Sequence, residues 1–197
     1  MLTAIGSDGI LFNLADHKGE LNDLRKLRNK SEYFCPVCGL KMMMKLGEKR
    51  IWHFAHQGTA FCNERWEPES NYHLTGKLQL YEWIKKDHSD VKVECYLPVS
   101  RQRPDLLLPS SSIAIEYQCS LINNNLLKQR TSDYQHLGLD VYWILGAKRL
   151  KINYHQIHSI REMEWAAVSI RKGSPILFYY CPEEKKFALV TLHYSLT

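Results

Sequence analysis

Long apolar runs are missing from this 197-residue chain. A membrane-spanning helix needs about 20 consecutive apolar residues, and no segment of the sequence reaches that length. The first 19 residues carry acidic and polar side chains where a secretory signal peptide needs an apolar centre. Internal repeats and low-complexity tracts are also lacking. We therefore expect a cytoplasmic protein without a membrane span.

The chain also lacks a strong excess of charge of one sign. Its 26 basic and 21 acidic residues give a formal net charge of +5 and a pI near 8.8. Domains dedicated to nucleic acids often have a pI above about 9. The charge therefore permits a nucleic-acid partner without requiring one.

The hydrophobic pattern divides the chain near residue 66. Residues 1–66 predict a short strand pair around residue 11, a helix over 20–30 and a Cys/His cluster with few apolar side chains for a core. Residues 67–197 predict helices over 69–86, 123–137 and 154–170, strands over 91–99, 103–108, 113–119 and 141–145, and a final hairpin over 176–180 and 187–192. This order of elements predicts a mixed α/β core.

Five residues of the N-terminal region have the spacing of metal ligands. Cys35 and Cys38 are separated by two residues, and His53, His56 and Cys62 follow. A structural zinc site is closed by four protein ligands, so there is one candidate more than there are places. We favour Cys35, Cys38, His56 and Cys62, with His53 as the alternative. In a chain without a signal peptide, reduced core cysteines beside ordinary histidines are the competing interpretation.

The second motif is a proline–aspartate pair followed, after ten residues, by Glu116 and Gln118. Asp105 begins one predicted strand and Glu116 lies late in the next, so a hairpin can bring the two carboxylates together. Glu116 and Gln118 point to the same face because they are two residues apart on a strand. Mg²⁺ neutralises paired carboxylates and can activate water for attack on a phosphodiester. We predict Asp105 and Glu116 as Mg²⁺ ligands; a chance pairing of acidic residues is the alternative.

A predicted helix adds polar side chains to the same site. Glu69, His73 and Lys77 recur every four residues and therefore share one helix face. They could reach a metal ion or a phosphate, or they could form a solvated face stabilised by pairing along the helix. Arg130 and Tyr134 have the same spacing on the next helix and offer a phosphate contact.

Taken together, these segments resemble the competence protein CoiA family. The resemblance rests on residues 33–39 (YFCPVCG), 53–56 (HFAH), 69–78 (ESNYHLTGKL), 102–107 (QRPDLL), 113–120 (IAIEYQCS), Arg130 with Tyr134, and 143–146 (WILG). It implies a zinc-ribbon-like N-terminal region and a restriction-endonuclease-like core of the PD-(D/E)XK superfamily, a mixed sheet flanked by helices. Carried over residue by residue, it implies catalytic positions at Glu69, His73, Lys77, Asp105, Glu116 and Gln118, and nucleic-acid contacts at Ser120, Arg130 and Tyr134.

The resemblance also implies a function in natural transformation and recombination. The implied activity is that of a Mg²⁺- or Mn²⁺-dependent endo- or exodeoxyribonuclease, a hydrolase acting on single-stranded or branched DNA beside recombination proteins. A DNA-binding or recombination-recruiting module with the same fold and no cleavage is the alternative. A zinc-containing transcription regulator is disfavoured because no helix-turn-helix pattern is evident.

Two features depart from the superfamily pattern. The PD-(D/E)XK superfamily usually has a lysine at the position of Gln118. The pattern of the CoiA family, like this chain, has glutamine there. Either Lys77 supplies the missing positive charge, or the activity is weak or absent. Members of the family typically continue past the hairpin near Leu192, so the resemblance implies that a C-terminal region is missing.

Overall fold

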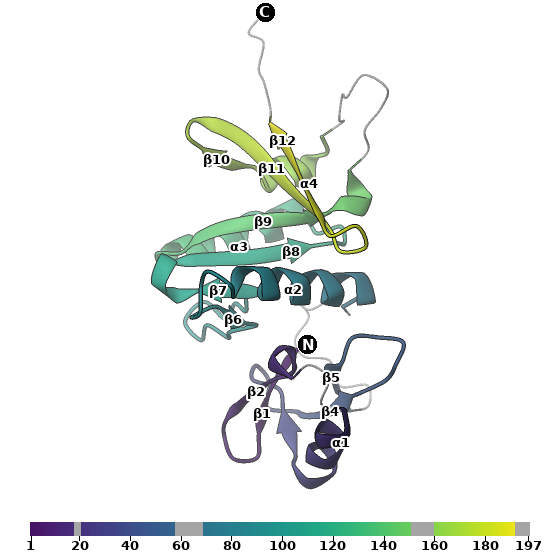
Figure 1. Ribbon diagram of the computed structural model, residues 1–197. Coiled ribbons are helices and arrows are strands. Elements are labelled where there is room, and N and C mark those ends of the chain that lie inside the picture. Colours follow the sequence, from purple (N-terminus) through teal and green to yellow (C-terminus); the bar gives the residue numbers. More distant parts are fainter. Residues whose placement is uncertain (18–20, 58–68, 151–159, 192–197) are drawn as a thin grey trace, which may run out of the picture.

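The chain forms two units in a computed structural model that describes residues 1–17, 21–57, 69–150 and 160–191 (Figure 1). We call residues 1–57 the N-terminal unit and residues 69–191 the C-terminal unit. The N-terminal unit lies against the part of the C-terminal unit that contains helix α2 (Asn71–Ile84) and strand β6 (Lys92–Val93). No helix among the described residues combines the length and apolar character that a bilayer crossing requires.

An antiparallel sheet with strand order β2-β1-β3-β4-β5 forms the N-terminal unit. Its elements are β1 (Thr3–Gly6), β2 (Leu11–Asn13), the 3-10 helix η1 (Leu14–Asp16), α1 (Leu21–Lys30), β3 (Tyr33–Phe34), β4 (Lys41–Lys45) and β5 (His53–His56). The predicted helix over 20–30 is confirmed by α1.

This unit has a hydrophobic core, contrary to the expectation from its composition. Met42, Met44 and Phe54 are buried together with Leu14 and Leu24. Strand β4 reads Lys-Met-Met-Met-Lys, and its side chains alternate between exposed and buried. The three consecutive methionines conceal this alternation, in which every second side chain faces the core.

A mixed sheet with strand order β10-β11-β9-β8-β7-β6, in which β12 also pairs with β11, forms the C-terminal unit. Its strands are β6, β7 (Leu106–Leu108), β8 (Ile113–Gln118), β9 (Asp140–Gly146), β10 (Ser169–Arg171), β11 (Ser174–Cys181) and β12 (Lys186–Thr191). Its helices are α2, η2 (Pro109–Ser111), α3 (Asn124–His136), η3 (Ala147–Arg149) and α4 (Glu162–Ala166). Strands β8, β9 and β11 are parallel neighbours, whereas β6, β7 and β8 are antiparallel neighbours.

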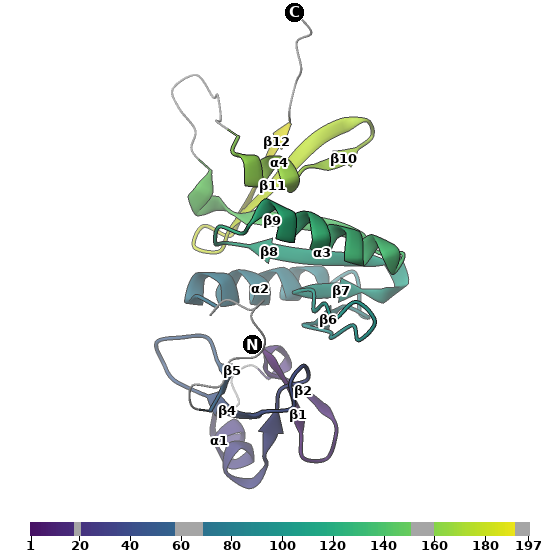
Figure 2. The same cartoon turned by 180° about the vertical axis from the view of Figure 1, so that it is seen from behind.

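Helices cover both faces of this sheet. Ile144 of β9 packs in the cluster that contains α2, whereas the adjacent Leu145 packs in the cluster that contains α3 and α4. Opposite views of the molecule show α2 on one side of the sheet and α3 on the other (Figures 1 and 2). The predicted mixed α/β fold with flanking helices is therefore confirmed.

Two predicted elements differ from the structure. The strand expected over 91–99 is reduced to β6, because Glu94 has a positive φ of 49° and takes the chain out of the extended conformation. The helix expected over 154–170 is wrong at its end, where β10 pairs with β11. Residues 151–159 of that helix lie outside the described residues.

The two units meet along α2. At its start, the Ile51 backbone N–H donates to Asn71 Oδ1 over 3.1 Å. Near its end, the Tyr81 hydroxyl donates to Asp16 Oδ1 over 2.7 Å, and Lys85 forms an ion pair with the same oxygen. The helix that carries His73 and Lys77 is thus also the helix on which the N-terminal unit docks.

Candidate active site and metal-binding clusters

Asp105, His73 and Glu69 form a potential metal-binding group. Ligand atoms of the three side chains lie within 4.8 Å of one another. His73 Nε2 is 3.1 Å from Asp105 Oδ2, and His73 Nδ1 is 3.4 Å from Glu69 Oε1. The Ser70 side chain caps α2 by accepting a hydrogen bond from the His73 backbone N–H. This cap fixes the helix start that presents His73 to Asp105, and Glu69 directly precedes the cap.

Lys77 lies on the same face of α2 and is completely buried. Its ammonium contacts Glu69, lies 2.6 Å from Glu94 Oε1 and lies 3.1 Å from Asp105 Oδ1. The interpretation of this face as a solvated one is therefore wrong, because Lys77 has 0% exposure. A buried ammonium needs charged partners of this kind.

The electrostatics keep these acidic groups ionised. Burial alone would raise the pKa of Asp105, but the Lys77 ammonium and the His73 imidazole outweigh burial and lower it. Burial would likewise raise the pKa of Glu69, but Lys77, the Met1 ammonium and His73 together outweigh burial and hold this pKa well below its ordinary value. A divalent cation requires ligand carboxylates in this ionised form.

Glu116 lies on β8, the strand next to Asp105. Asp105 directly precedes β7, whose first residue Leu106 pairs with Ile115 of β8. The Tyr117 backbone N–H donates to Asp105 Oδ2 over 2.9 Å, which ties the two strands together at this point. Among the described residues, however, Glu116 is not part of the group with Glu69, His73 and Asp105.

The Glu116 carboxylate is held from the α3 side of the sheet. Arg130 forms an ion pair with Glu116 Oε1 at 2.5 Å, and the Tyr134 hydroxyl donates to the same oxygen. Burial raises the pKa of Glu116, and the nearby Asp105 charge adds to this rise although Arg130 opposes it. Asp105 and Glu116 therefore shift in opposite directions, a property that active sites use to separate the roles of two carboxyl groups.

The residues predicted to contact nucleic acid, Ser120, Arg130 and Tyr134, differ in their exposure and in their contacts. Gln118 Nε2 donates to the backbone oxygen and to the hydroxyl of Ser120, each over 3.0 Å. Arg130 also lies over the Trp143 ring, 5.2 Å from its centroid. Tyr134 has 0% exposure. Contact of these residues with DNA stays a prediction, whereas Arg130 and Tyr134 have an immediate role as partners of Glu116.

Two buried charged residues of this region were missed in the sequence. Glu94 and Arg103 are 1% and 6% exposed, and Arg103 Nη1 lies 3.7 Å from Glu94 Oε2. The available signal was an acidic residue beside alternating valines in the segment Val-Lys-Val-Glu. That alternation predicts a strand but does not identify the partners that neutralise Glu94.

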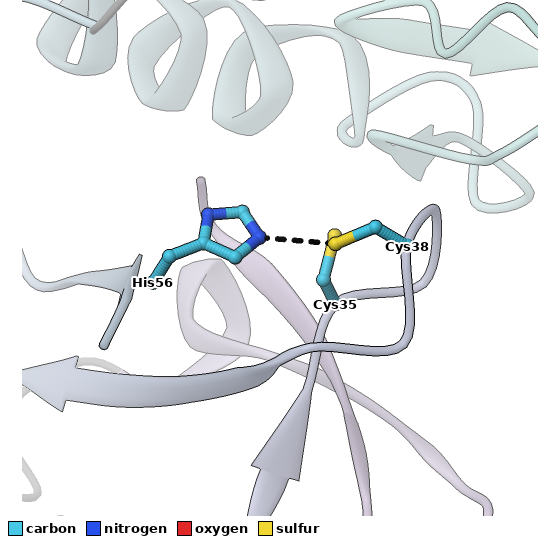
Figure 3. A group of neighbouring side chains, drawn as sticks. All are labelled: Cys35, Cys38 and His56. Carbon is cyan, nitrogen blue, oxygen red and sulfur yellow. Dashed lines mark hydrogen bonds between the residues drawn. The ribbon is translucent and has the colours of Figure 1, made fainter. Parts of the chain in front are cut away.

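Cys35, Cys38 and His56 form a second potential metal-binding group, with ligand atoms within 4.8 Å of one another. Both cysteines lie in one turn, and the His56 ring points from β5 toward them (Figure 3). His56 Nε2 is 3.3 Å from Cys38 Sγ, and the Val37 N–H donates to Cys35 Sγ over 3.4 Å. Gly39 closes the turn with a positive φ of 70°. Two thiols and an imidazole are three of the four ligands that a structural zinc site requires.

Among the described residues, His53 is not part of this group. His53 Nδ1 donates to the Ile51 carbonyl over 2.8 Å. Cys62 lies outside the described residues. Burial lowers the pKa of both His53 and His56, which favours the neutral ring that a metal needs. The choice of the fourth ligand stays a prediction.

Comparison with known proteins identifies relatives for both units. Residues 17–65 match the family model "Competence protein CoiA, N-terminal domain", and residues 69–197 match "Competence protein CoiA, nuclease-like domain". The competence protein CoiA of Bacillus subtilis (strain 168) is 36% identical over 167 residues, which cover 83% of this chain and 44% of that protein. The chain thus spans less than half the length of this relative. No solved structure matches. The chain belongs to the competence protein CoiA family.

Proposed function

We propose that the C-terminal unit is a metal-dependent nuclease of the PD-(D/E)XK type that hydrolyses DNA during natural competence. The observation that carries this proposal is the convergence of Glu69, His73 and Asp105 from two separate segments. A cluster of ionisable side chains with strongly shifted pKa values is typical of functional sites. The name of the Bacillus relative supports the link with competence.

The donor set fits a divalent cation. Glu69 and Asp105 supply ionised oxygens, and His73 supplies a ring nitrogen. Glu116 would complete the set from β8, with Arg130 and Tyr134 fixing its carboxylate. When bound, a divalent cation generates a nucleophile from water at neutral pH and offsets the charge that develops on the phosphate. Mn²⁺ accepts imidazole more readily than Mg²⁺, which prefers oxygen ligands.

The protein side chains have separate tasks in this proposal. Lys77 holds Glu69 and Asp105 in place from the buried side. Gln118 and Ser120, which are partly or fully exposed beside Glu116, would orient the phosphate or the attacking water. Recombination proteins are the expected partners, and single-stranded or branched DNA is the expected substrate.

One observation favours a second function, a DNA-binding module that does not cleave. The ammonium of Lys77 already neutralises the carboxylates of Glu69 and Asp105, and Gln118 carries no charge. A site whose negative charges are neutralised by its own lysine needs no metal ion. Such a protein would retain the fold and bind DNA without hydrolysing it.

The test is incubation of the purified protein with end-labelled single-stranded, duplex and branched DNA in Mn²⁺, Mg²⁺ or EDTA. We expect cleavage with both ions, faster with Mn²⁺, and none with EDTA. Asp105→Asn is the inactive control and should still bind DNA, because affinity comes mainly from Lys and Arg contacts to phosphate. Binding without cleavage of any substrate would overturn the nuclease proposal and support the second function.

For the N-terminal unit, we propose a structural zinc ion held by Cys35, Cys38 and His56 in a zinc-ribbon-like arrangement. Cys62 is the proposed fourth ligand, and His53 is the alternative. A set of protein ligands without an open position suits a structural rather than a catalytic ion. Measurement of the zinc content in Cys62→Ser and His53→Ala distinguishes the two candidates.

A further inference from the structure

The two carboxylate oxygens of Glu94 accept hydrogen bonds from different units. Oε1 accepts from the Lys77 ammonium over 2.6 Å, inside the C-terminal unit. Oε2 accepts from the Leu2 N–H over 2.9 Å, from the Thr3 N–H over 3.1 Å and from the Thr3 hydroxyl over 3.0 Å, all in the N-terminal unit. A single buried side chain therefore contacts both the docked strand β1 and the ammonium next to Asp105.

The backbone of Glu94 is held in a rare conformation. Its φ of 49° lies in the left-handed region, which is strained for a non-glycine residue, and such strain is concentrated at functional sites. The Glu94 N–H donates to the Asp105 carbonyl over 3.0 Å. This bond places Glu94 directly beside the backbone of the proposed metal ligand, and the left-handed turn aims its carboxylate at both Lys77 and β1.

The charges around Lys77 explain how the N-terminal unit influences the position of its ammonium. Three carboxylates, from Glu69, Glu94 and Asp105, surround the one ammonium of Lys77. The three hydrogen bonds from the N-terminal unit stabilise negative charge on Glu94. A carboxylate fixed in this way holds the Lys77 ammonium at a set distance from Asp105. If β1 were withdrawn, Glu94 would lose three donors at once and Lys77 would be held by fewer fixed partners.

We infer that Glu94 is a positioning residue that couples the docking of the N-terminal unit to the placement of Lys77 beside Asp105. The N-terminal unit is then a part of the site rather than an independent attachment. The consequence for cleavage rests on the proposed nuclease function, whereas the placement of Lys77 does not. The coupling also runs in reverse, because a ligand that favours the ordered site must favour the docked unit by the same free energy.

The test uses four variants of the full chain. Glu94→Gln removes the charge, and Thr3→Val removes one hydroxyl donor while preserving the shape of the side chain. Thr3→Ser keeps the hydroxyl and serves as the rescue. Asp16→Asn is the matched control, because Asp16 joins the two units through Tyr81 and Lys85 but has no contact with Lys77.

The measurements are Mn²⁺ affinity by electron paramagnetic resonance, the DNA cleavage rate, and the ¹⁵N signal of the Lys77 ammonium. We expect Glu94→Gln to weaken Mn²⁺ binding or cleavage by about 10–100-fold, the usual effect of removing a residue that orients a metal ligand. Thr3→Val should shift the Lys77 signal and reduce cleavage by about threefold to tenfold. Thr3→Ser and Asp16→Asn should stay within about twofold of the wild type.

The inference is overturned if Thr3→Val, correctly folded by circular dichroism, behaves like Asp16→Asn in all three measurements. If Glu94→Gln does not fold, Thr3→Val alone decides. Wild-type protein that neither binds Mn²⁺ nor cleaves DNA would remove the proposed function but not this inference. In that case the Lys77 signal decides: a shift in Thr3→Val and none in Asp16→Asn supports the coupling, and no shift in either overturns it.

Discussion

The Lys77 ammonium lies 3.1 Å from Oδ1 of Asp105, and the lysine side chain is completely buried. A buried ammonium cannot be a passive surface charge, because its desolvation costs several kcal/mol unless carboxylates surround it. Lys77 therefore organises the acidic group of Glu69, Glu94 and Asp105. In the proposed nuclease, Lys77 would supply the positive charge that Gln118 lacks.

Substitution of Lys77 by methionine should destabilise the protein strongly. Lys77→Met leaves Glu69, Glu94 and Asp105 facing one another, and removing one member of a buried ion pair costs about 3–5 kcal/mol. Chemical denaturation measures this loss as the free energy of unfolding. Lys41→Met is the control: its partner Glu32 and Lys41 itself are both exposed, so the loss should stay below about 1 kcal/mol. Equal losses in the two variants would contradict the assigned role.

Mn²⁺ should stabilise Lys77→Met more than it stabilises the wild type. A divalent cation can take over the neutralisation of Glu69 and Asp105 once the ammonium is gone, and a ligand that binds only the folded state raises stability by mass action. Thermal unfolding with increasing Mn²⁺ measures the effect. An equal rise in Tm for both proteins would show that Lys77 and the ion do not compete for these carboxylates.

Gly76→Ala should destabilise the protein although alanine favours helices. A Cβ at Gly76 would lie 2.1 Å from Tyr117 Cε1, and overpacking of a core costs typically about 1–3 kcal/mol. This cost exceeds the gain in helix propensity of roughly 1 kcal/mol. Gly47→Ala is the matched control, since no atom lies within 4 Å of its added Cβ. The comparison is made by denaturation, and a Gly76→Ala protein more stable than the wild type would refute the packing argument.

Acid should remove a stabilising contribution of Glu94. Burial alone would raise the pKa of Glu94, but Lys77 and Arg103 outweigh burial and lower it from 4.5 to about 2. A group with a lowered pKa stabilises the fold above its ordinary pKa and loses this contribution as the pH falls toward the lowered value. In EDTA, the stability of the wild type should therefore fall more steeply below about pH 5 than that of Glu94→Gln.

Glu116 changes the stability of the fold with pH in the direction opposite to Glu94. Its pKa is raised, mainly by burial, so its contribution is present below the ordinary value and is lost as the pH rises through the raised value. Glu116→Gln should remove this part of the pH dependence. Identical pH dependence of stability in the wild type, Glu94→Gln and Glu116→Gln would contradict both assignments.

Purified protein should contain about one zinc ion per chain, and Cys38→Ser should lose it. Because the N-terminal unit has a core of its own, we expect this variant to lower the stability of that unit while the sheet around β8 stays folded. Cys181→Ser is the control, since Cys181 is a free cysteine on β11 that lies outside the group. Elemental analysis and near-ultraviolet circular dichroism test this, and a fully folded, metal-free wild type would contradict it.

Local patterns were sufficient for much of the fold. The four-residue spacing of Glu69, His73 and Lys77 predicts one helix face, and α2 presents His73 and Lys77 to Asp105, whereas Glu69 precedes the N-cap residue Ser70. The spacing of Glu116 and Gln118, two residues apart on β8, likewise predicts a shared face. Predictions of this kind need only one helix or one strand, because a single element determines which of its side chains share a face.

Contacts between distant segments could not be predicted from such patterns. Glu94 is stabilised by Leu2 and Thr3, which are about ninety residues away, and no local periodicity encodes that distance. The pairing of Glu116 with Arg130 and Tyr134 likewise depends on how α3 packs on the sheet. The core of the N-terminal unit was missed because its apolar residues are distributed over several short strands, each too short to show a clear period.

The most direct test of the account is anomalous X-ray diffraction from crystals of the wild-type protein and of Asp105→Asn soaked in Mn²⁺. We expect one manganese peak in the wild type, roughly 2.0–2.4 Å from ligand atoms of Glu69, His73 and Asp105, and a strongly reduced peak in Asp105→Asn. A wild-type map with no manganese at these three residues, or with manganese only at Cys35, Cys38 and His56, would contradict the central claim.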